Sequence, residues 1–64
     1  MSTGIPLPDG IGAPPRRALA AAGYERLEQV GGLSARHLHA LHGVGPKAVR
    51  LLREALAEHG LGLG

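Results

Sequence analysis

The sequence predicts an all-α domain of four helices, and three observations support this class. No stretch shows the alternation of apolar and polar residues that marks a half-buried strand. Apolar residues instead recur at helical spacing, and glycines follow the helical stretches. The 64 residues form one small domain at most, near the lower limit for independent folding. We place it at residues 8–64, because residues 1–7 show no periodic pattern and are expected to form a flexible N-terminal arm.

Proline and glycine delimit the first two helices. Proline suits the first turn of a helix, so the first helix should begin near Pro14 or Pro15 and run through Ala22. Gly23 can then adopt the left-handed conformation that ends a helix. A short second helix is expected over about residues 27–30, where it meets a Gly-Gly pair.

A serine and a proline mark the starts of the third and fourth helices, and a glycine marks the end of the fourth. Ser34 is expected to cap a third helix over residues 35–41, because its hydroxyl can accept a hydrogen bond from a free first-turn amide. The fourth and longest helix should run from Pro46 to about His59 and stop at Gly60. Its apolar face holds Ala48, Val49, Leu52, Ala55 and Leu56, with Leu51 at the boundary.

Composition restricts the possible functions. There is no cysteine, so neither a disulfide nor a thiolate metal site can brace the domain. The net charge of +2 is modest and permits a nucleic-acid partner without requiring one. The sequence shows neither an apolar run long enough for a membrane span nor the pattern of a signal peptide, so we expect a cytoplasmic protein with no membrane partner.

A glycine turn separates the third and fourth helices. Gly43 and Gly45 suit backbone conformations that a Cβ would penalise, and Val44 between them can point into the core. Pro46 fits the first helical position, because its missing N–H would have no partner there anyway.

The start of the fourth helix has the ingredients of a phosphate site. The amides of Gly45, Lys47 and Ala48 lack helical partners, and a lysine stands beside them. This stretch resembles the helix-hairpin-helix motif, in which a hydrophobic-Gly-hydrophobic-Gly hairpin and the following helix start grip the backbone of a nucleic acid. The resemblance implies that the third and fourth helices form such a motif.

A related glycine turn occurs earlier in the chain. Residues 10–19 align with residues 43–52, and both read Gly-aliphatic-Gly followed by proline, arginine and leucine. The similarity reflects either an internal duplication or the features that helix starts share. The first copy has two prolines in its first turn and therefore fewer free amides. The second turn is thus the better phosphate cradle, with Arg16 and Arg17 as flanking contacts.

Charges stand at the helix ends that stability alone would not favour. Acidic residues stabilise helix starts and basic residues stabilise helix ends. Here basic residues cluster near predicted starts, namely Arg16, Arg17, Arg36, Lys47 and Arg50, whereas Glu54 and Glu58 lie in the second half of the fourth helix. The pattern favours a face that binds an anion. The alternative is an ordinary Arg50–Glu54 pair on a solvated surface.

Residues 11–64 as a whole resemble the C-terminal domain of the bacterial RNA polymerase alpha subunit. The resemblance is carried by an Ala-Gly helix end, a short Leu-rich segment, a Ser-led helix, the Gly-Val-Gly-Pro-Lys turn and a long helix closing on Glu-His-Gly-Leu-Gly. It implies a compact four-helix, SAM-like domain. It also implies that Gly45 and Lys47 contact DNA, because they match the family's glycine and lysine.

Other positions depart from the family pattern. The arginine that the family inserts into the minor groove falls on Pro14, its neighbouring asparagine on Arg17, a contacting serine on Ala48 and a glutamate on Leu51. The elements that grip the backbone are retained, whereas the side chain that reads the groove is replaced. We therefore expect DNA binding largely without sequence specificity.

No enzymatic chemistry is evident. The sequence offers no nucleophile–base pair, no small-molecule substrate site and no cofactor motif. His39 and His42 could share a helix face, but no third metal ligand stands nearby, so we expect no metal site.

The sequence thus predicts a small non-enzymatic module that binds the phosphate backbone of double-stranded DNA. Its expected binding residues are Gly43, Val44, Gly45, Lys47, Ala48, Arg50, Arg16 and Arg17. The alternative is a protein-interaction module that docks a partner through exposed leucines such as Leu51, Leu61 or Leu63.

Overall fold

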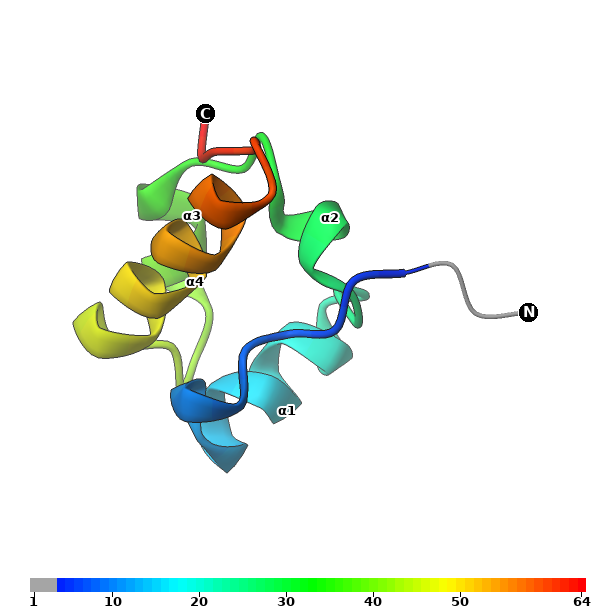
Figure 1. Cartoon of the computed structure of the whole chain (residues 1–64). Helices are drawn as coiled ribbons and strands as arrows, with labels where there is room; N and C mark the ends of the chain where they lie inside the picture. The colour runs from blue at the N-terminus through cyan, green and yellow to red at the C-terminus, as the bar shows by residue number, and fades with distance from the viewer. Residues whose placement is uncertain (1–3) are drawn as a thin grey trace.

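The computed structural model describes residues 4–64 and shows a compact all-helical domain (Figure 1). A 3-10 turn precedes four α-helices: η1 (Asp9–Ile11), α1 (Ala13–Ala21), α2 (Leu27–Val30), α3 (Ala35–Ala40) and α4 (Pro46–Glu58). The described residues form no strand, only an isolated antiparallel bridge between Pro6 and Arg26. The all-α class and the four helices are therefore confirmed.

The helix ends follow the local signals in the sequence. Gly23 and Gly60 take positive φ angles of 95° and 74° after α1 and α4. Ser34 caps α3, because its hydroxyl accepts a hydrogen bond from the His37 amide at 3.0 Å. The boundaries differ from expectation by a residue or so, for example at the end of α3, where Leu41 is already extended.

Helix α4 is the central element of the core. It packs against η1, α2 and α3, and Figure 1 shows it lying beside α3. The apolar face expected for this helix is buried at Ala48, Val49, Leu52 and Leu56, while Ala55 is half-buried. The core is otherwise aliphatic, and its fully buried large side chains are Leu19, Leu27, Leu38, Leu52, Leu56 and Val30.

The N-terminal segment differs from the expected flexible arm. Residues 1–3 of that arm lie outside the described part of the chain, but the part that follows packs onto the domain. Leu7 is 5% exposed and belongs to the core. Ile5 accepts a hydrogen bond from the Leu27 amide at 2.7 Å, and its own amide donates to the Glu28 carboxylate at 2.8 Å. The segment is held because it completes one side of the core beside α2 and α4.

The C-terminal tail returns to the loop between α2 and α3. The Gly32 amide donates to the Gly62 carbonyl at 2.9 Å, and the Gly64 amide donates to the Leu33 carbonyl at 2.8 Å. These bonds bring Leu63 against the core, where it is half-buried.

Candidate nucleic-acid interface

The turn between α3 and α4, which we call the second glycine turn (residues 43–45), has one strained position and one buried side chain. Gly43 has φ of 98°, a conformation that L side chains rarely adopt. Val44 is 6% exposed and joins the core, as the sequence predicts. Its amide donates to the Leu41 carbonyl at 3.1 Å. Val44 therefore anchors the turn and has neither a side chain nor an amide available for a ligand.

Gly45 differs from what the sequence predicts. Its φ of −107° and ψ of −177° are extended backbone that any residue adopts. A Cβ built on Gly45 would meet nothing within 4 Å. The expectation that a Cβ would be penalised is thus right for Gly43 and wrong for Gly45. The space beside Gly45 is open, so a side chain would fit there.

The α4 start presents free amide donors. The first helical hydrogen bond of α4 runs from the Val49 amide to the Gly45 carbonyl at 3.1 Å. Within residues 4–64, no acceptor is recorded for the amides of Gly45 and Lys47, and no side chain caps the helix. The Ala48 amide also precedes the helical ladder, but Ala48 is only 4% exposed. Gly45 is half-buried and Lys47 is exposed, so these two residues, unlike Ala48, have surface open to an external acceptor.

The basic side chains near this helix start are not neutralised within the domain. Lys47 and Arg50 are exposed, and the first turn of α4 contains no acidic residue. In the described part of the chain only Arg16–Asp9 and Arg26–Glu28 come within ion-pair distance. The alternative Arg50–Glu54 pair is not formed, so Arg50 remains available to an external anion.

The earlier, first glycine turn (residues 10–12) has a different conformation. Gly10 belongs to η1, and the positive φ of 89° falls on Gly12, the N-cap of α1. In the second turn the positive φ falls on the first glycine instead. The two turns do share a buried central residue, Ile11 or Val44, each 6% exposed. The sequence repeat therefore preserves the burial pattern and not the backbone path.

The two arginines after the first glycine turn have different surroundings. Arg16 donates from its guanidinium to the Pro8 carbonyl at 3.1 Å and lies 3.7 Å from the Asp9 carboxylate. Arg17 is exposed and has no recorded side-chain partner among the described residues. Arg17 is therefore the more available of the two for an external anion. Arg16 connects α1 to the segment before η1.

The second glycine turn lies against the start of α1, as the adjoining ribbons in Figure 1 show. A Cβ on Gly43 would stand 3.2 Å from the Pro14 carbonyl oxygen and 3.7 Å from the Ala18 Cβ. The contact brings the beginning of α1 beside the turn that leads into α4. Basic residues that are about 30 positions apart in the chain are thereby gathered on neighbouring elements.

Two positions that the resemblance compares with polar contact residues serve the core instead. Ala48 is buried, and Leu51 is half-buried and packs against the core. A Cβ on Gly10 would lie 3.5 Å from a Leu51 methyl carbon, which places Leu51 beside η1. Pro14 is exposed.

The leucines of the alternative protein-interaction surface are mostly covered. Leu51 and Leu63 are half-buried against the core. Leu61 is 41% exposed and is the one exposed large apolar side chain recorded for residues 4–64. That surface therefore reduces to a single leucine.

The histidines make no metal cluster in the described chain. Residues 4–64 contain no group of three or more His, Cys, Asp or Glu side chains placed to hold a metal ion. His37 instead lies 3.4 Å from the Tyr24 hydroxyl, with the two rings edge to face at 6.3 Å. The sequence gives no sign of this contact, because Tyr24 lies in the loop after α1 whereas His37 lies in α3. None of the described helices has the length and apolar character needed to cross a membrane.

Comparison of this chain with protein-family models, curated proteins and solved structures finds no match.

Proposed function

We propose that this domain binds the phosphate backbone of double-stranded DNA through the second glycine turn and the start of α4. The observation that carries the proposal is the pair of amides at Gly45 and Lys47, which have no acceptor among residues 4–64 and stand beside an exposed lysine side chain with no ion-pair partner in that range. Amides at a helix start donate to phosphate oxygens, and the helix dipole favours the negative charge.

The surrounding charges extend this contact. Arg50 lies one helical turn after Pro46 on the exposed side of α4, and Arg17 lies on the neighbouring α1. Neither has an internal ion-pair partner in the described residues, so a phosphate would not have to displace one. Binding would be weak and nearly independent of base sequence, because phosphate contacts carry no sequence information directly.

The resemblance to the polymerase alpha-subunit domain supports the same assignment. We infer that α3, the second glycine turn and α4 act as a helix-hairpin-helix within a SAM-like domain, with Gly45 and Lys47 in the positions that contact DNA. The positions that would read the groove hold Pro14 and Leu51, a ring without a donor and an aliphatic side chain. These replacements favour a backbone contact over recognition of a particular sequence.

The proposal is tested by titrating a labelled DNA duplex with the full chain at several salt concentrations. Three to five phosphate contacts give a log–log slope of about −3 to −4.5. Lys47→Gln should weaken binding and make the slope less steep by about one unit. Arg53→Gln removes the same charge from an exposed α4 position six residues further on and should have a smaller effect. Equal effects of the two substitutions, or no binding at low salt, would overturn the proposal.

An amide chemical-shift titration separates DNA binding from the protein-interaction alternative. With a short duplex, shifts should concentrate at residues 43–50 and around Arg17. Silence there, together with concentration-dependent shifts around Leu61 in the absence of DNA, would favour self-association or a protein partner. Arg17→Gln should weaken duplex binding, since Arg17 is exposed and not engaged elsewhere.

A further inference from the structure

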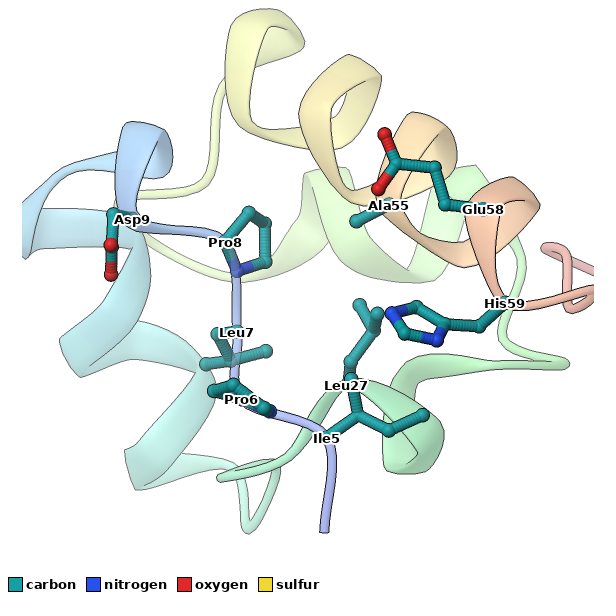
Figure 2. A pocket seen from close by; sticks show the side chains of 9 residues that line it. All are labelled: Ile5, Pro6, Leu7, Pro8, Asp9, Leu27, Ala55, Glu58 and His59. Carbon is teal, nitrogen blue, oxygen red and sulfur yellow. The ribbon is translucent and has the colours of Figure 1, made fainter.

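A pocket of about 400 Å³ lies at the other end of α4, between that helix, α2 and the N-terminal segment (Figure 2). Its lining is mainly aliphatic and is contributed by Ile5, Pro6, Leu7, Pro8, Leu27 and Ala55. Figure 2 shows the His59 ring and the Leu27 side chain turned into this space, with Glu58 on the α4 side. The volume falls at the lower end of the range of pockets that hold small ligands.

The charged groups of this pocket are acidic, apart from its histidine. Asp9 and Glu58 line it, and no lysine or arginine does. Asp9 lies 3.7 Å from Arg16, which offsets part of its charge. Glu58 has no ion-pair partner among residues 4–64. Leu7 and Leu27 are core residues, so the apolar surface open to a ligand comes mainly from Ile5, Pro8 and Ala55. The pocket therefore combines this apolar surface with one uncompensated carboxylate.

The polarity of α4 adds to this negative potential. A helix C-terminus carries partial negative charge, which basic residues in the last turn usually offset. The last turn of α4 contains no basic residue and ends with Glu58. Reversed charge thus occurs at both ends of α4: the start attracts an anion, and the end attracts a cation.

We propose that this pocket binds a segment of a partner protein in which an aliphatic side chain is followed by a lysine or arginine. The aliphatic group packs on the partly exposed side chains of Ile5, Pro8 and Ala55. The cationic group pairs with Glu58 at the C-terminal end of α4. The site is separate from the α4 start, so it can be occupied with or without DNA.

The test is an amide chemical-shift titration of the full chain with acetyl-Ala-Leu-Lys-Ala-amide. Shifts should concentrate at Ile5, Leu7, Leu27, Ala55 and His59. The matched peptide acetyl-Ala-Leu-Glu-Ala-amide should bind about three- to tenfold more weakly, because its charge repels the same carboxylate. The peptide acetyl-Ala-Ala-Lys-Ala-amide, which has the cation without the aliphatic side chain, should also bind more weakly.

Two matched variants locate the interaction. Glu58→Gln should abolish most of the preference for lysine over glutamate in the peptide. Glu54→Gln removes the same charge one turn earlier, from an exposed residue that does not line the pocket, and should keep the preference. The proposal is overturned if millimolar lysine peptide shifts no pocket residue, or if both variants lose the preference equally. Neither result depends on DNA binding, so the two proposals fail independently.

Discussion

Gly43 faces the backbone of Pro14 so closely that a Cβ added to Gly43 would lie 3.2 Å from the Pro14 carbonyl oxygen. This contact joins the turn before α4 to the first turn of α1. Glycine is therefore required at position 43 for two reasons, the φ angle of 98° and the lack of space for a Cβ. Gly45, two residues later, is required by neither.

The two glycines should therefore respond differently to alanine. Gly43→Ala should lower the free energy of unfolding by about 1–3 kcal/mol, from backbone strain and the approach to Pro14. Gly45→Ala should change it by less than about 1 kcal/mol, but should weaken duplex binding, because a methyl group next to the α4 start restricts the approach of a phosphate. Urea unfolding and a duplex titration measure the two effects. A Gly45→Ala variant with unchanged duplex affinity would contradict the proposed cradle.

The N-terminal segment should contribute to stability through Leu7. Leu7→Ala should cost about 2–4 kcal/mol, because Leu7 is 5% exposed and its removal opens a cavity in a thin aliphatic core. Leu61→Ala makes the same truncation at a residue that is 41% exposed and should change stability by less than about 0.5 kcal/mol. The comparison needs only urea denaturation of the two variants. Equal, small effects would show that the segment does not hold the core together in solution.

Substitutions of Arg16 and Arg17 should have different effects on stability. Arg16→Gln should lower the free energy of unfolding by about 0.5–1.5 kcal/mol, because the Pro8 carbonyl loses a charged donor. Arg17→Gln should leave stability within about 0.5 kcal/mol. Thermal unfolding checks this directly, and the arrangement is refuted if Arg17→Gln is the more destabilising change.

Glu28 should make stability depend on pH. The hydrogen bond from the Ile5 amide is the main cause that lowers the pKa of Glu28 below its ordinary value of 4.5, and its own backbone amide and Arg26 act in the same direction. A carboxyl whose pKa is lower in the folded state stabilises the fold fully above its unfolded pKa. That contribution is lost as the pH falls below 4.5 and through the lowered folded-state pKa.

Urea unfolding at several pH values tests this dependence. Glu28→Gln should be less stable than the native chain at pH 7, and the difference should shrink at pH values below the ordinary Glu pKa. Glu54→Gln provides the control, since Glu54 has no recorded partner in the described residues. A constant Glu28→Gln difference across the whole pH range would show that the Ile5 contact does not depend on ionisation.

The helices could be predicted because their signals are local. Gly23, Ser34, Pro46 and Gly60 each act on the backbone within a turn of their own position, and the helix ends fall within about two residues of where those signals place them. The buried face of α4 follows in the same way from apolar spacing along a single helix.

The candidate site could be predicted only in part. The free amides at the α4 start follow from helix geometry, so the sequence indicates them directly. The engagement of Arg16 by Pro8 and the burial of Ala48 depend on other segments. The pocket beside Glu58 could not be predicted, because one of its walls is the N-terminal segment. That segment has no periodic pattern from which its packing could be inferred.

The sequence by itself determined the fold class, the helix boundaries and the basic, amide-bearing start of α4. The tertiary structure alone decided that Gly43 rather than Gly45 is sterically required, that Arg16 is occupied and Arg17 is free, and that the N-terminal segment closes a pocket. The physical reason is the range of the interactions. Capping, helix periodicity and chain reversal act over a few residues, whereas close approach and burial join segments that the chain order separates.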